Sequence, residues 1–300
     1  MIPSHCRLEC STTRPYLSVP ENQGTAASVL VQCTACSLVI ESPRPSKEQI
    51  DAFYSNEALW TNSRDAEGHQ RSYVNELLAK RPQFDDLVQR IERFRHGGRL
   101  LDVGAGAGLL EKSLDPGRWQ VVGVESSRYI AEFGARELHT RVTAGYFEDM
   151  ALEPASFDVV VMKYVLDHME RPWDALVRAS EVLKPGGLLV IADLINIDSF
   201  SARFFAEGHR LFHPMHFTYF SAQTASAHLE RLGFRVIEVD RPFVKTPYCT
   251  AKKLRTFAGR VVRRALNRLR GNNEKVFSTA FYGNMIDVFA VSGSPISRTS

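Results

Sequence analysis

From Arg99 onward, short apolar runs alternate with amphipathic runs, and this alternation constrains the fold more than any other feature of the chain. The runs at 99–104, 119–126, 157–165 and 187–195 have the character of strands, and helical spacing lies between them. The run at 157–165 is almost continuously apolar, which is typical of a strand buried on both faces. We therefore expect an α/β fold with a mainly parallel, doubly wound sheet.

The loop after the first of these strands, in the sequence RLLDVGAGAGLL, carries glycine at every second position. Ligands of doubly wound sheets bind outside the carboxyl ends of the strands, so this loop is the expected binding site. The spacing differs from the G-x-G-x-x-G of dinucleotide-binding enzymes, and no G-K-[ST] phosphate loop is present. Asp102 would repel a pyrophosphate but suits a cationic ligand. Glu125 ends the second strand, where an acid typically accepts hydrogen bonds from a ribose.

Four segments, taken together, resemble the class I S-adenosylmethionine-dependent methyltransferases: LLDVGAGAG, VVGVESS, residues 157–194 and FSAQTASAHLERLGF. They cover most of residues 99–240 in the order of that family. The resemblance implies a Rossmann-like seven-stranded sheet with helices on both faces, whose last strand, here NMIDVFAVSG, runs antiparallel. It also implies S-adenosyl-L-methionine as the cofactor, bound by Asp102, Gly104, Ala105, Gly106, Gly108, Glu125, Ser126, Phe147, Glu148 and Lys163.

The same resemblance assigns roles to some of these positions. Asp102 would orient the glycine loop and the amino acid end of the cofactor, and Glu125 would hold the ribose hydroxyls. Tyr146 stands where the family often has an aspartate near the adenine. The adenine contact is therefore left open among Tyr146, Phe147 and Glu148.

Two segments rich in histidine supply the candidates for catalysis. His168 follows the strand at 157–165 and has the chemistry of a general base. The resembling family, however, often has a histidine here that only packs around the cofactor. We favour this packing role for His168. The stretch GHRLFHPMHFTYFS carries several more, and in the resembling enzymes this region faces the acceptor. His216 is the first candidate for a base or acceptor-binding residue, and Tyr219 is the second. Metal binding by these histidines and a purely structural role are the alternatives.

Four of the five cysteines, Cys6, Cys10, Cys33 and Cys36, lie in the first 36 residues. Two close cysteine pairs suit a four-thiolate zinc site, which would supply the folding energy that so short a segment lacks. The segment resembles the zinc ribbon that precedes some bacterial methyltransferases, including sugar C-methyltransferases. We expect a structural zinc here, with a metal-free relic as the alternative.

The chain is expected to divide into a zinc-ribbon-like segment at 1–45, a helical linker or lid at 46–97 and the methyltransferase core at 98–300. Ser46 has the character of a helix N-cap, and a break is expected near Pro82. The aromatic residues of the second zone either exclude water from the acceptor or pack the domain interface; they are Phe53, Tyr54, Trp60 and Tyr73.

The formal net charge of +3 does not mark a nucleic-acid-binding protein. Residues 252–270 are nevertheless a strongly basic amphipathic run without any acid. This run predicts a helix with a solvated basic face, or one that contacts an anionic membrane surface or an anionic acceptor. No apolar run approaches the roughly 20 residues that cross a bilayer, and no secretory signal is evident, so we expect a cytoplasmic protein.

We therefore expect a methyltransferase that acts on a small or medium acceptor. A sugar or nucleotide-sugar is the preferred acceptor, on the analogy with the zinc-ribbon relatives. The alternatives are methylation of RNA or protein, and a catalytically silent binding protein. The intact Asp102, glycine loop and Glu125 argue against a silent protein.

Overall fold

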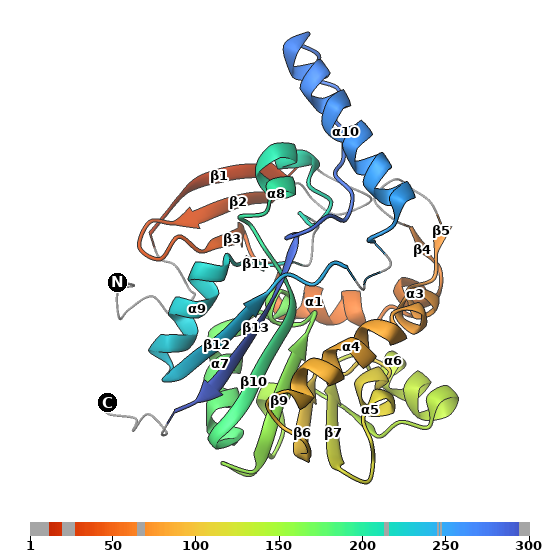
Figure 1. Ribbon diagram of the computed structural model, residues 1–300, viewed down its shortest axis with the longest axis vertical. Helices are drawn as coiled ribbons and strands as arrows, with labels where there is room; N and C mark the ends of the chain where they lie inside the picture. The colour runs from red at the N-terminus through yellow and green to blue at the C-terminus, as the bar shows by residue number, and fades with distance from the viewer. Residues whose placement is uncertain are drawn as a thin grey trace.

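The computed structural model describes residues 12–19, 28–64, 70–212, 216–244, 246 and 248–293. Its central element is a seven-stranded sheet with the strand order β12-β13-β10-β9-β6-β7-β8 (Figure 1). β13 is antiparallel to both of its neighbours, and all other pairs are parallel, which confirms the predicted sheet with a reversed last strand. The strands are β6 Gly98–Val103, β7 Trp119–Glu125, β8 Val142–Ala144, β9 Phe157–Lys163, β10 Leu183–Ile195, β12 Phe234–Asp240 and β13 Met285–Ser292.

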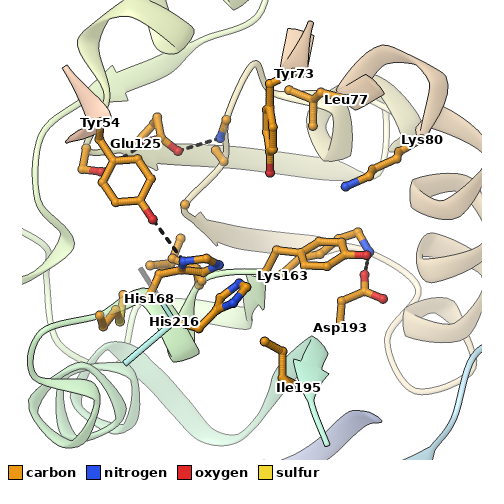
Figure 2. Close-up of a pocket in the computed structure, with 18 of the residues that line it drawn as sticks. Tyr54, Tyr73, Leu77, Lys80, Glu125, Lys163, His168, Asp193, Ile195 and His216 are labelled. Atoms are coloured by element: carbon orange, nitrogen blue, oxygen red, sulfur yellow. Dashed lines mark hydrogen bonds and ion pairs between the residues drawn. The ribbon is translucent and has the colours of Figure 1, made fainter. Parts of the chain in front are cut away.

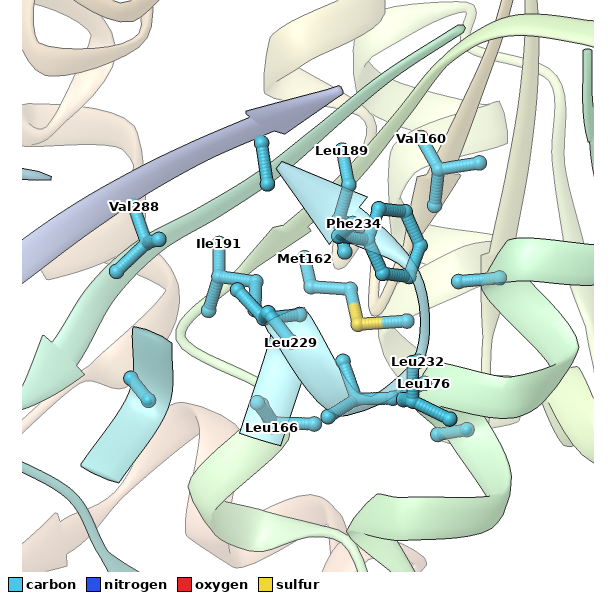
Figure 3. Close-up of a cluster of buried hydrophobic side chains, with 14 of the residues drawn as sticks. Val160, Met162, Leu166, Leu176, Leu189, Ile191, Leu229, Leu232, Phe234 and Val288 are labelled. Carbon is cyan, nitrogen blue, oxygen red and sulfur yellow. The ribbon is translucent and has the colours of Figure 1, made fainter. Parts of the chain in front are cut away.

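Helices cover both faces of this sheet because successive strand residues point to opposite sides. Leu100 packs in one hydrophobic cluster with residues of α4 and α5. Its neighbour Leu101 packs in the other cluster with residues of α7 and α9, part of which Figure 3 shows. The nearly continuous apolar run of β9 therefore fills both cores, as predicted. The helices are α4 Arg81–Glu92, α5 Leu109–Ser113, α6 Arg128–Phe133, α7 Pro172–Val182 and α9 Ala222–Arg231.

A second, four-stranded sheet has the order β1-β2-β3-β11. Its first three strands come from the amino-terminal segment, whereas β11 comes from the region before α9 and pairs antiparallel with β3. Leu38 and Ile40 belong to the same hydrophobic cluster as the central sheet. The described part of segment 1–45 thus shares a core with the rest of the chain. These strands are β1 Thr13–Val19, β2 Ser28–Cys33, β3 Val39–Ser42 and β11 Thr218–Tyr219.

The described part of the zone at 46–97 is mainly helical, as predicted, and also contains the short strand pair β4–β5. Ser46 caps its first helix, because its hydroxyl accepts from the Gln49 amide while the Gln49 side chain accepts from the Ser46 amide. The predicted break near Pro82 falls at Lys80, and Pro82 lies in the first turn of α4, where its missing amide hydrogen costs nothing. The remaining elements of this zone are α1 Lys47–Tyr54, α2 Glu57–Thr61, β4 Ser63–Arg64, β5 Gln70–Arg71 and α3 Tyr73–Ala79.

Two boundaries differ from those expected. The helical segment between β7 and β8 changes from α6 to a π-helical turn at Gly134–Leu138, where Gly134 lies against the Ala107 backbone too closely for any side chain. β10 begins at Leu183, four residues before the apolar run at 187–195 that predicted it. Short 3-10 helices occupy Phe147–Asp149, Leu166–His168 and Ala206–Gly208.

The basic run forms α10 Ala251–Leu269, as predicted, and this helix projects away from the body (Figure 1). Phe257 anchors it against Phe205 and Val276, close to α8 Phe200–Phe205. Within the described ranges, no helix combines the length and the apolar character that crossing a membrane requires.

Candidate active site

A cavity of 1230 Å³ lies at the carboxyl ends of β6, β7, β9 and β10. The sheet provides one wall, and residues of α1, α2 and α3 provide another. Small-molecule pockets usually measure about 300–1,000 Å³, so this cavity has room for a cofactor together with an acceptor. All four aromatic residues predicted for the lid line it, and Trp60 and Tyr73 also pack edge to face, 5.3 Å apart. They therefore both line the cavity and pack against one another.

The glycine loop forms the edge of this cavity. Gly104 has φ +69°, and a Cβ atom there would lie 2.6 Å from Val165 Cγ2, so the loop requires glycine at this position. Gly106 and Ala105 also line the cavity. Gly108 does not: it caps α5 in the left-handed conformation and lies against Thr140. This corrects the prediction of a cofactor contact for Gly108, whose glycine is required by the turn.

Glu125 holds the loop against the end of β7. Its carboxylate accepts hydrogen bonds from the backbone amides of Gly106 at 2.9 Å and Ser127 at 2.8 Å, and from the Ser126 hydroxyl at 3.3 Å. Burial raises the pKa of the Glu125 carboxyl, whereas these hydrogen bonds lower it. The carboxylate is thus fixed in the cavity wall, as the ribose-binding role requires (Figure 2).

Asp102 lies at the end of β6, is buried and lines the same cavity. Burial, and then the charge of Glu125, raise the pKa of its carboxyl to about 8. A cationic group bound nearby would favour the ionised form. The residues present therefore fit a cofactor that carries a ribose and positive charge, as the sequence predicts.

The raised pKa of Asp102 predicts a pH-dependent affinity for S-adenosylhomocysteine. Binding of its ammonium group beside an ionised Asp102 requires the carboxyl to lose its proton, so affinity should rise by about fivefold between pH 7 and pH 8. Calorimetry between pH 6 and pH 8 measures this slope. Methylthioadenosine, which lacks the amino acid group, and the Asp102→Asn variant should both give a flat profile. An equal slope in Asp102→Asn would assign the effect to another group.

The other predicted cofactor residues lie further along the cavity. Phe147 and Glu148 line it, as does Tyr146, whose hydroxyl donates to Asp51 of α1. Lys163 also lines it, but its ammonium group pairs with Asp193 of β10, and burial lowers its pKa to about 8. Lys163 is thus an element of the wall that is already neutralised by an acid of the same sheet.

His168 and His216 lie together on the side of the cavity opposite Glu125 (Figure 2). Their ring centroids are 4.3 Å apart. The Nε2 atoms of His168 and His216 are 4.0 Å and 3.9 Å from Oδ2 of Asp167. Asp167 is only 1% exposed, and burial raises its pKa. No other described residue lies in hydrogen-bond geometry with either of its carboxylate oxygens, while the charge of His168 and the backbone amide of Asp167 itself lower its pKa.

The outer nitrogens of the two imidazoles are held by different elements. The Nδ1 atom of His168 lies 3.0 Å from the hydroxyl of Tyr54, which belongs to α1. The Nδ1 atom of His216 lies 3.0 Å from the carbonyl oxygen of Leu211. The Tyr54 carbonyl in turn accepts from Ser127, which ties α1 to the turn after Glu125. Both ring orientations are therefore set by the fold.

The other candidates from the same stretch are placed elsewhere. Tyr219 is buried in a cluster with Val39 and Phe212 and does not line the cavity, although its ring packs edge to face against that of His216, with centroids 6.4 Å apart. This corrects the prediction that Tyr219 faces the acceptor. His209 is buried beside Ser278, and burial lowers its pKa to about 3. His213 lies outside the described residues.

Cys33 ends β2 and Cys36 lies on the turn between β2 and β3, and both are buried. Cys6 and Cys10 lie outside the described residues. The four-thiolate zinc site stays a prediction.

Sequence reasoning did not assign a role to Asp167, although it directly precedes His168. It also overlooked Lys80, whose ammonium group lies 4.5 Å above the ring of Tyr164 in the cavity wall. The position of Asp167 next to a candidate histidine was the available signal. Nothing in the sequence pattern marks Lys80.

Comparison with known proteins shows matches over the central part of the chain. A family model described as "Methyltransferase domain" matches residues 70–239, more than half of the chain. The ubiquinone biosynthesis O-methyltransferase of Xanthomonas euvesicatoria is 36% identical over 49% of this chain and 61% of its own length. That of Roseobacter denitrificans is 34% identical over 37% of this chain and 47% of its own length. The chain thus spans about half to three-fifths of these curated relatives.

Solved structures share the fold at low sequence identity. Phosphoethanolamine N-methyltransferase 2 of Haemonchus contortus, solved with S-adenosyl-L-methionine, has a TM-score of 0.53 and 15% identity. The match covers 85% of this chain and 63% of that one. A SAM-dependent methyltransferase from Thermotoga maritima has a TM-score of 0.50 and 22% identity, over 73% of this chain and 96% of that one.

Proposed function

The chain belongs to the class I S-adenosylmethionine-dependent methyltransferase family, and we propose that it transfers the methyl group to a hydroxyl of a small, largely apolar acceptor. The observation that carries this proposal is the pair of imidazoles in the cavity wall opposite Glu125, backed by the buried carboxylate of Asp167. An amine acceptor attacks through its own lone pair. A hydroxyl must also lose a proton, and this cluster supplies groups that can accept one.

The character of the remaining wall supports an apolar, flat acceptor. Aromatic side chains from α1, α2 and α3 and from the segment before α10 line the cavity; they are Phe53, Tyr54, Trp60, Tyr73, Phe243 and Tyr248. Such rings pack well against an aromatic acceptor and exclude water from it. The names of the O-methyltransferase relatives agree with this chemistry. They lend no support to a sugar or nucleotide-sugar, which stays a prediction without a supporting observation.

The cofactor supplies an electrophilic methyl group on a sulfonium centre. The chain's own residues then act mainly by position. Glu125 and the glycine loop hold the nucleoside end, and the α1–α3 lid excludes water. The cluster of His168, His216 and Asp167 places the acceptor oxygen and promotes the loss of its proton.

A product assay tests this proposal directly. Purified protein is incubated with S-adenosylmethionine and a panel of catechols, phenols, matched anilines and nucleotide-sugars, and the products are identified by mass spectrometry. We expect methyl ethers of the phenolic compounds. Methylated anilines or sugars in the absence of methyl ethers would contradict the proposal.

We also propose that α10 contacts an anionic membrane surface, which would bring the enzyme to an apolar acceptor. Leu254, Val262, Leu266 and Leu269 are exposed on this helix, and Leu269 is 84% exposed. Exposed cations flank them, among them Lys252, Lys253, Arg255 and Arg270. An apolar strip with flanking positive charge is the pattern of helices that lie in the headgroup region of anionic bilayers.

Charge reversal on α10 should weaken binding to anionic vesicles. Each cation near such a surface contributes about 1 kcal/mol, so Lys252→Glu/Lys253→Glu/Arg255→Glu should reduce partitioning by about 100-fold. Co-sedimentation with phosphatidylserine-containing and purely phosphatidylcholine vesicles measures it. The matched variant Lys112→Glu/Arg128→Glu/Arg136→Glu reverses three exposed cations elsewhere. Equal losses in both variants would point to net charge rather than to α10.

A further inference from the structure

Asp167, His168 and His216 direct three metal-ligand atoms to one point beside the cavity. One ligand atom from each residue lies within 4.8 Å of those of the other two. Asp167 and His168 belong to the short helix after β9, and His216 precedes β11. The packing of the fold, not a local sequence motif, brings the three together.

The buried carboxylate is the first sign that a ligand is involved. Both oxygens of Asp167 lie in the protein interior without a hydrogen-bond donor among the other described residues. The Nε2 atoms of His168 and His216 lie 4.0 Å and 3.9 Å from its Oδ2 atom, which is too far for hydrogen bonds. A buried carboxylate is costly unless it is paired or coordinates a metal ion. A cation between the three groups would satisfy it.

The tautomers of His168 and His216 also support a bound ligand at this cluster. The Leu211 carbonyl can only accept, so the Nδ1 atom of His216 carries its hydrogen and the Nε2 lone pair is directed at the point between the three residues. The Tyr54 hydroxyl can accept in the same manner from Nδ1 of His168. Metal-ligating histidines almost always donate their other ring N–H in this way.

The distances require only a small adjustment. A divalent transition-metal ion binds imidazole nitrogen at about 2.0–2.1 Å, which places tetrahedral ligand atoms about 3.4 Å apart. The observed separations from Asp167 Oδ2 are 3.9 Å and 4.0 Å. A contraction of about half an ångström brings each imidazole to that separation from the carboxylate, and all three ligand atoms already lie within 4.8 Å of one another. Two histidines and one carboxylate leave further coordination positions open.

We propose that Asp167, His168 and His216 bind a divalent transition-metal ion whose open position faces the cavity and holds the acceptor oxygen. This deepens the proposed function and rests on it. The bound ion acts as a Lewis acid, so the acceptor hydroxyl gives up its proton to solvent more easily. The resulting oxyanion forms a bond to the methyl carbon as the carbon–sulfur bond breaks, and the electron pair of that bond stays on sulfur.

Cobalt(II) titration of the full chain, first stripped of metal with a chelator, tests this proposal. Imidazole and carboxylate ligands give visible d–d bands without the intense near-ultraviolet thiolate-to-cobalt absorption, so this site is distinguished from the four cysteines. We expect such bands in the unaltered chain, and a loss of cobalt affinity of about 100-fold in Asp167→Asn and in His216→Ala. His96→Ala, which removes an exposed imidazole outside the cavity, should keep the unaltered affinity.

Calorimetry with S-adenosylhomocysteine shows that each variant is folded, because the cofactor residues are unchanged. Cobalt affinity that is the same in Asp167→Asn, His216→Ala and the unaltered chain would overturn the proposal, and so would a spectrum with thiolate absorption alone. Methyl-ether formation that persists in the stripped protein would overturn it as well, while the proposed function stands. A metal-loaded protein that methylates amines and no hydroxyl would contradict the proposed function but not the metal site.

Discussion

Replacing Glu125 with alanine is expected to weaken S-adenosylhomocysteine binding by about 100-fold or more. The carboxylate is positioned to accept from the ribose hydroxyls, and hydrogen bonds to a charged group contribute about 1.5–3 kcal/mol each. It also anchors the amides of Gly106 and Ser127, so its loss leaves both donors of the loop without their partner. The affinity should therefore fall through lost contacts and through a looser loop. Isothermal titration calorimetry at constant pH measures the change.

Two further variants make this result specific. Glu125→Gln keeps the shape but places an NH₂ group against one of the two backbone amides, so it should bind with intermediate affinity. Glu132→Gln alters an exposed acid on α6 and should bind like the unaltered protein. Unchanged affinity in Glu125→Ala would remove Glu125 from the cofactor site.

The central sheet was predictable because its strands carry strong local signals. The runs ending at Asp102 and Glu125 alternate with amphipathic helices, and a parallel sheet buried on both faces follows from that alternation. The second sheet was not predictable in the same way. Its β11 is only two residues long, Thr218–Tyr219, and it forms because Val39 and Ile40 offer an edge to pair with. Such a contact between distant segments leaves no periodic pattern in the sequence.

The residues of the candidate site also differ in how well the sequence predicts their positions. The residues predicted for the cofactor follow directly from strand ends, and Asp102, Gly104 and Glu125 do line the cavity there, while their contacts with the cofactor stay a prediction. The acceptor end depends on how the region before β11 folds back over the helix after β9. Positions close together in that region therefore lie in different surroundings: His216 lines the cavity, whereas Tyr219 is buried in the second sheet. Asp167 acquires its importance only through the two imidazoles that the fold places around it.

His216→Ala should lower the turnover of methyl transfer by about 100-fold or more while leaving S-adenosylhomocysteine affinity within about twofold. The imidazole lies at the acceptor end of the cavity, across from Glu125 and the glycine loop. Loss of a group that accepts a proton, or that ligates a catalytic metal, typically costs two orders of magnitude or more. Steady-state kinetics with a phenolic acceptor, together with calorimetry for the cofactor, separates the two effects.

Tyr219→Phe is the informative comparison, since its hydroxyl belongs to the second sheet and not to the cavity. It should retain most of the turnover, although both residues come from the same short stretch of sequence. A large loss in Tyr219→Phe with little loss in His216→Ala would reverse the assignment and place the acceptor on the other side of β11. A loss of cofactor affinity in His216→Ala would instead show that this imidazole supports the nucleoside end as well, through the contacts that link it by way of His168 and Tyr54 to the turn after Glu125.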